Sequence, residues 1–136
     1  MENSKFVNSF INGLIEPQDF THREHIRAAF CLLKNKPFLE SCIAMRDGLK
    51  ILAFKAGKPN LYHETITVAF MAIISERISS NRGLNYIEFM ARNDDLTNQT
   101  ILGRYYSKAA LESTIAREQF LLEDSSKRKS MEKAND

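Results

Sequence analysis

The three histidines of the chain, His22, His25 and His63, lie in two short polar segments, residues 21–25 and 62–67. Histidine is the side chain whose unperturbed pKa is nearest neutrality, and it is the commonest protein ligand of metal ions. Each segment directly precedes an apolar stretch with helical spacing, so each histidine is expected near the start of a helix. This grouping predicts a functional pocket that contains the histidines.

His22 and His25 are three residues apart, which places them on one face of a helix. Thr21 is predicted to be the N-cap of this helix, and Glu24 has the spacing to complete a capping box with it. The positive end of the helix dipole disfavours a charged imidazole, so both rings are expected to be neutral near pH 7. A neutral imidazole can ligate a metal ion, accept a proton or polarise a carbonyl group.

His63 is predicted to lie in the first turn of a later helix that is capped by Asn60, with Thr67 one turn further on the same face. This setting is that of a neutral imidazole tuned for proton transfer. We predict that His63 is the reacting or ligating group, and that His22 and His25 position a substrate or metal opposite it.

Glu64 projects about 100° away from His63 around the same helix, so a single metal ion could not easily bind both side chains. Glu64 is interpreted as a carboxylate that orients another group, acts as a base from an adjacent face, or pairs with an arginine. The catalytic candidates are therefore His63, His25 and Glu64, and the candidates for substrate binding include His22 and Thr67.

A bound metal is an alternative to simple acid/base chemistry. Three histidine ligands, His22, His25 and His63, would suffice for a catalytic zinc or iron site with an open coordination position. The chain has no HExxH sequence, so it does not resemble the zincin metalloproteases. Cys31 and Cys42 have no metal-ligand spacing and are interpreted as small buried hydrophobic residues.

The chain has the pattern of one helix after another. We predict an all-α domain of five to six helices that spans residues 1–122, around a central buried helix at about 61–79. The continuous apolar run at 68–74 defines that helix, with a buried strand as the alternative. Gly48 is interpreted as a close packing contact or a kink. The predicted core residues of the preceding helix, 38–56, are Leu39, Cys42, Ile43, Met45, Leu49, Leu52 and Phe54.

The composition is that of one globular domain, with 43% hydrophobic and 26% charged residues among 136. The net charge of +2 gives no argument for nucleic-acid binding. No apolar stretch is long enough to span a membrane and the N-terminus has no signal-peptide pattern, so a soluble, cytoplasmic protein is expected. Residues 123–136 carry balanced charges and are predicted to form a polar, disordered tail.

Residues 21–26 (THREHI) and 62–67 (YHETIT) resemble the paired HRxH and YHETIT motifs of a family of small, uncharacterised bacterial all-helical proteins. The resemblance covers about residues 16–122 and includes a later arginine–tyrosine–serine stretch. It implies no particular activity, but it implies that five further residues belong to the pocket, as substrate-binding candidates: Tyr62, Arg104, Tyr106, Ser107 and Arg117. Arginine and tyrosine beside neutral histidines would suit an anionic or carbonyl-bearing small molecule.

The chain has no GxGxxG, GxxxxGK[ST] or GxSxG motif, so no nucleotide cofactor is expected. Three classes of function remain. The first is a small enzyme that acts on a small molecule through acid/base or metal-assisted chemistry. The second is a non-catalytic small-molecule-binding or sensor domain, and the third is a helical protein-interaction protein with incidental histidines. The expected partner is a small-molecule ligand, and neither nucleic acid nor a membrane is expected. The oligomeric state is not predicted, and a homodimer is one alternative.

Overall fold

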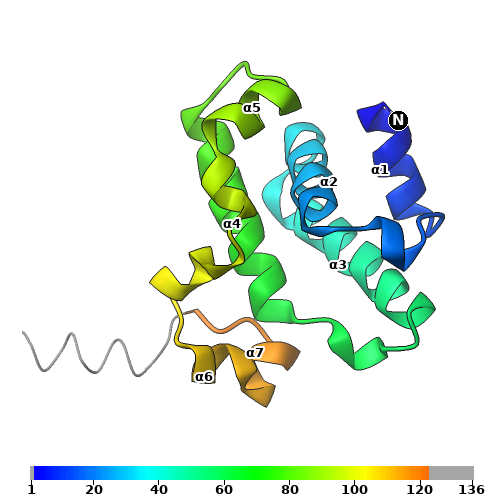
Figure 1. The fold of residues 1–136 in the computed structure, drawn as a ribbon, viewed down its shortest axis with the longest axis vertical. Coiled ribbons are helices and arrows are strands. Elements are labelled where there is room, and N and C mark those ends of the chain that lie inside the picture. Colours follow the sequence, from blue (N-terminus) through cyan, green and yellow to red (C-terminus); the bar gives the residue numbers. More distant parts are fainter. Residues whose placement is uncertain (1, 123–136) are drawn as a thin grey trace, which may run out of the picture.

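The computed structural model describes residues 2–122, and this part of the chain forms helices joined by loops, without strands (Figure 1). The predicted all-α fold is therefore confirmed, whereas the polar segment 123–136 lies outside the described residues. The α-helices are α1 (Asn3–Ile11), α2 (His22–Asn35), α3 (Phe38–Lys55), α4 (Glu64–Ser80), α5 (Tyr86–Arg92), α6 (Lys108–Glu112) and α7 (Thr114–Glu118). Four short 3-10 helices connect them: η1 (Pro17–Asp19), η2 (Pro59–Leu61), η3 (Asp94–Thr97) and η4 (Gln99–Arg104).

Two helices, α2 and α4, lie at the centre of the fold. The α4 helix packs against α2, α3 and α7, as predicted for the apolar run at 68–74, and α2 packs against α1, α3, α4 and α5. Residues 28–32 of α2 are all buried, so this helix is enclosed on nearly all sides. The predicted central helix thus exists as α4, but it shares the centre with α2.

The helix boundaries follow local chemistry. The three prolines stand outside the α-helices: Pro17 and Pro59 each begin a 3-10 helix, and Pro37 is the N-cap of α3. The capping box predicted for α2 is wrong, because the Thr21 side chain makes no capping hydrogen bond and Glu24 instead pairs with Arg27 at 3.7 Å.

The predicted core of α3 is partly wrong. Cys42, Met45 and Leu52 are buried, but Leu39 (73% exposed), Ile43 (49%) and Phe54 (76%) face solvent. The α3 helix carries apolar residues on more than one face, so the pattern did not identify which face packs against α2 and α4.

Gly48 is a close packing contact. A Cβ atom at this position would lie 2.3 Å from Cζ of Phe10, whose side chain is 1% exposed. The Phe10 ring therefore rests directly on the backbone of α3. It also stacks on Phe20, with ring centroids 5.0 Å apart, and so supports the residue that precedes the first histidine segment.

Replacing Gly48 by Ala is expected to lower the free energy of unfolding by about 1–3 kcal/mol, because the enclosed Phe10 ring cannot move away cheaply. Urea denaturation of the purified full chain measures this change. Gly103→Ala is the matched control, since no heavy atom lies within 4 Å of the added Cβ there. Equal stabilities of the two variants would contradict the close contact.

Candidate functional site

A cavity of about 830 Å³ lies between the starts of α2 and α4, the inner face of α3, and the segment from η4 to α7. Its volume is within the usual range for small-molecule sites. All three histidines line it, so the structure brings both histidine segments to one cavity. Most of its wall is apolar: Pro17, Phe20, Ala29, Met45, Leu49, Leu52, Ala53, Ala56, Leu61, Ile66, Phe70, Met71, Leu102 and Leu111.

His63 is the N-cap of α4 rather than a residue of its first turn. Its Nδ1 accepts a hydrogen bond from the backbone N–H of Ile66 (3.1 Å), and its Nε2–H donates to the carbonyl oxygen of Leu111 (2.6 Å). The two partners fix the neutral Nε2–H tautomer and occupy both ring nitrogens. The predicted cap, Asn60, is wrong, because it lies in η2. No nitrogen of His63 is left to ligate a metal or to accept a proton in this arrangement.

His22 is the first residue of α2, and one of its ring nitrogens makes a hydrogen bond within the protein. Nε2–H donates to the carbonyl oxygen of Leu96 in η3 at 3.0 Å, and the ring meets Phe70 edge-on with centroids 5.4 Å apart. These contacts orient the ring, because they fix both its tilt and the nitrogen that carries the proton.

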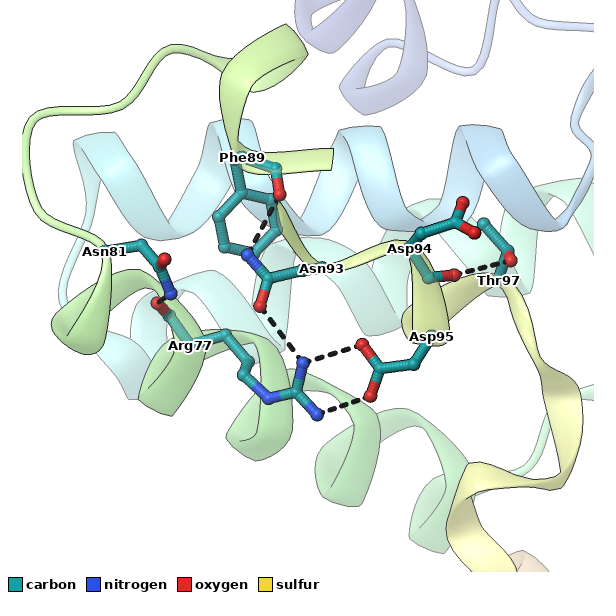
Figure 2. Close-up of polar contacts among 7 residues, drawn as sticks. All are labelled: Arg77, Asn81, Phe89, Asn93, Asp94, Asp95 and Thr97. Atoms are coloured by element: carbon teal, nitrogen blue, oxygen red, sulfur yellow. Dashed lines mark hydrogen bonds and ion pairs between the residues drawn. The ribbon is translucent and has the colours of Figure 1, made fainter. Parts of the chain in front are cut away.

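A polar cluster around Arg77 (Figure 2) lies next in the chain to Leu96, whose carbonyl oxygen accepts the hydrogen bond from His22. The guanidinium of Arg77 on α4 makes a bidentate pair with Asp95 (2.9 and 2.7 Å) and also donates to Asn93 Oδ1 (3.0 Å). Asn93 in turn donates to the carbonyl oxygen of Phe89 (2.9 Å). The cluster fixes η3 against α4 and α5, and Leu96, one residue after Asp95, is fully buried. The hydrogen bonds that Asp95 accepts from Arg77 hold the pKa of the Asp95 carboxyl below its ordinary value.

His25 differs from the other two histidines. Its ring contacts Phe20 (centroids 4.6 Å apart) and lies near His22 (6.4 Å), but it makes no hydrogen bond to any residue within 2–122. Burial, and secondarily the neighbouring His22, lower the pKa of His25 to about 4. At neutral pH the ring therefore has one N–H donor and one lone pair that the described residues do not use.

Four other predicted site residues also line the cavity, but their polar atoms bind the protein itself. The Tyr62 hydroxyl donates to Glu64 Oε1 (2.5 Å), and the Thr67 hydroxyl donates to the carbonyl oxygen of His63 (2.8 Å). The Tyr106 hydroxyl donates to the carbonyl oxygen of Leu121 (2.6 Å). The guanidinium of Arg117 donates to the carbonyl oxygens of residues 60 and 61, at 3.0 and 3.2 Å.

Three predicted site residues do not line the cavity. Glu64 is held by the Tyr62 hydroxyl, and Arg104 is exposed at the end of η4. Ser107 is the N-cap of α6, where its hydroxyl oxygen accepts from the backbone N–H of Ala110 (3.1 Å). The structure therefore does not bring the predicted catalytic carboxylate or the predicted substrate-binding Arg104 to the histidines.

The described residues do not form a metal site by themselves. No group of three or more His, Cys, Asp or Glu side chains within 2–122 has an arrangement that could hold a metal ion. Cys31 and Cys42 are free, buried thiols outside the cavity wall, and burial raises the pKa of Cys42 to about 11. They serve as small hydrophobic residues, as the sequence indicates.

Sequence reasoning missed Phe20, Arg77 and Leu96. Phe20 had a usable signal, since it is an aromatic residue two positions before His22. Leu96 acts through its carbonyl group, which every residue has, so no sequence signal could have identified it.

Comparison of the chain with protein-family models, curated proteins and solved structures finds no match. The family resemblance of the two histidine motifs therefore stays a prediction. Within the described residues, no helix has the length and apolar character needed to cross a membrane.

Acidification is expected to destabilise the protein through His25. The unfolded chain binds a proton at this residue near the ordinary pKa of 6.5, whereas the folded protein binds it only near about 4. The unfolded state therefore binds more protons between these values, and stability falls with pH across this window by at most about 3 kcal/mol. Urea denaturation of wild type and His25→Gln between about pH 7 and pH 4 measures this, and the variant is expected to lose less stability. An NMR titration that places the pKa of His25 near 6.5 would contradict it.

Asp95→Asn is expected to free the proton on His22 Nε2 for faster exchange with solvent, because η3 loses its bidentate tie to Arg77. The change in stability should stay within about 1 kcal/mol, since Asp95 is half-exposed. NMR of the imidazole N–H signals detects the exchange. Asp47→Asn is the matched control, because Asp47 pairs with Arg46 (3.2 Å) away from the cavity wall. Identical exchange in both variants would show that the cluster does not position His22.

Proposed function

We propose that this protein is a small enzyme that encloses a small molecule in the histidine-lined cavity and uses His25 in acid/base chemistry at a polar group of that molecule. One observation carries this proposal. Of the polar side chains in the cavity wall, only His25 has neither a hydrogen bond nor an ion pair with the described part of the chain. The others are His22, Tyr62, His63, Thr67, Thr100, Tyr106, Lys108, Glu112 and Arg117.

The role that the sequence suggests for His63 is thereby assigned to His25. A group that already donates and accepts hydrogen bonds inside the protein must break them before it can react. His25 has no such cost, and its low pKa keeps the ring neutral over the physiological range. A neutral imidazole can donate its N–H to a developing oxyanion and receive a proton at its other nitrogen.

His22 fits a supporting role in this mechanism. Its Nε2–H is committed to Leu96, so its Nδ1 is the nitrogen left to meet a substrate or to influence His25. The metal-assisted alternative has less support, because His63 has no free nitrogen and no third ligand is arranged within 2–122.

A non-catalytic binding or sensor domain is the second candidate. The observation in its favour is that no second acid or base joins His25: Glu64 is outside the cavity wall, and Glu112 faces Lys108 at 3.9 Å. Such a domain would use His25 only to recognise its ligand.

A panel of small carbonyl and hydroxyl compounds is screened first for a rise in the melting temperature of the full chain. Each hit is then incubated in D₂O with wild type, His25→Gln or His63→Asn, and NMR follows deuterium uptake and product formation. His25→Gln is expected to lower the rate by about 10²–10⁴-fold, the usual contribution of a general acid or base. His63→Asn should lower the rate much less than this, because Asn still caps α4 and only the bond to Leu111 is lost.

The reverse pattern, with loss of turnover only in His63→Asn, would overturn this assignment. Binding that depends on His25 without turnover of any hit would identify the binding domain instead. Full turnover and binding in both variants would show that the histidines are incidental.

A further inference from the structure

The apolar wall of the cavity includes a stripe of side chains along α3. The stripe consists of four residues of α3, at positions 45, 49, 52 and 53, and the C-cap residue Ala56, and this spacing places them along one helical face. At 1.5 Å of rise per residue, the stripe is about 16 Å long. Ile66, Phe70 and Met71 come from the neighbouring helix, α4. An elongated hydrocarbon or a flat ring system is the shape that would cover such a stripe.

The polar group available to a ligand carries no charge. The rings in contact with His25 belong to Phe20 and His22, and neutral imidazole supplies one donor and one acceptor. The cations in the cavity wall, Lys108 and Arg117, belong to α6 and α7. Lys108 lies beside Glu112, and Arg117 is bound to backbone carbonyl groups of residues 60–62.

Both cations of the cavity wall already have partners within the protein: Lys108 pairs with a carboxylate, and Arg117 binds backbone carbonyl groups. Arg104, which the family resemblance implies, is exposed and outside the cavity. An anion next to His25 would therefore lose its hydration without gaining an unpaired positive charge from the cavity wall, which is unfavourable in an apolar cavity. A hydroxyl or carbonyl group loses far less hydration energy and can satisfy the imidazole directly.

We propose that the ligand of this cavity is an uncharged amphiphile, with an elongated apolar body along α3 and one hydroxyl or carbonyl group at His25. This inference rests on the proposed function, in that both place the reacting molecule in the same cavity. It adds the substrate class, and it selects a neutral molecule from the anionic and carbonyl-bearing alternatives.

The test uses probes that share a linear ten-carbon skeleton and differ in the polar group: 1-decanol, 2-decanone, 1-chlorodecane, decanoate and decylammonium. Binding to the full chain is measured by competition with a fluorescent hydrophobic dye near pH 8, where decanoate and decylammonium are charged. Decanol and decanone are expected to bind about tenfold more tightly than chlorodecane, because they satisfy an imidazole that chlorodecane leaves unpaired. Decanol and decanone should also bind at least about tenfold more tightly than decanoate and decylammonium.

His25→Phe is the matched variant, because it keeps an aromatic ring in contact with Phe20 and removes both nitrogens. In this variant the advantage of decanol over chlorodecane should disappear, while chlorodecane binds as well as or better than it does to wild type. Asp47→Asn should preserve the advantage, since Asp47 pairs with Arg46 away from the cavity wall.

Tightest binding of decanoate would overturn the inference and indicate that Arg117 or Lys108 selects an anion, while the proposed use of His25 in catalysis would stand. An advantage of decanol that survives His25→Phe would also overturn it, because another group would then bind the hydroxyl. Binding of none of the probes would exclude this class of ligand. Conversely, the expected binding pattern without turnover of any alcohol or ketone would support the inference and contradict the enzyme proposal.

Discussion

The hydrogen bonds of the His63 ring are the contact on which the rest of the site depends. One nitrogen caps α4 and the other binds the carbonyl oxygen of Leu111 in α6, so a single imidazole joins the start of a central helix to the C-terminal helices that close the cavity. Thr65 adds a second tie: its hydroxyl donates to the carbonyl oxygen of Gln119 and accepts from the N–H of Leu121. These bonds tie the start of α4 to α6 and to the segment after α7, and α7 packs against α4 (Figure 1).

The segment at 62–67 is thereby explained as an architectural unit. Each of its polar side chains has a structural partner: Tyr62 binds Glu64, Thr65 binds the C-terminal segment, and Thr67 binds the carbonyl oxygen of His63. The same residue types at the same spacing would also suit an active site, which is why the sequence favoured one here. Catalysis needs groups that are free to exchange hydrogen bonds during the reaction. Among the described contacts, each polar side chain of this segment is already bonded within the protein.

In the segment at 21–25, by contrast, His25 has no hydrogen-bond partner among the described residues. Aromatic packing that begins at α3 holds its ring in place. Gly48 allows the Phe10 ring to rest on α3, Phe10 stacks on Phe20, and Phe20 contacts the His25 ring. His25 is thus held by aromatic contacts, which fix its position without using its nitrogens. His22 is held by a hydrogen bond from one nitrogen to Leu96. The two neighbouring histidines are both oriented, but only His25 keeps its full capacity for hydrogen bonding.

The sequence predicted the helices because prolines and helical periodicity are local signals. It also placed the histidines at helix starts, where the structure has them. The sequence could not predict which histidine ring lacks hydrogen-bond partners. The partners of His63 and His22 are backbone carbonyl groups 48 and 74 residues away, and every residue has a carbonyl group. Arg104 and Ser107 show the same limit: a residue near the site in the chain can still face solvent or cap a helix. The set of bonds that a histidine's nitrogens already make separates a ring that is free to react from a structural one, and this criterion is the reason that we propose His25.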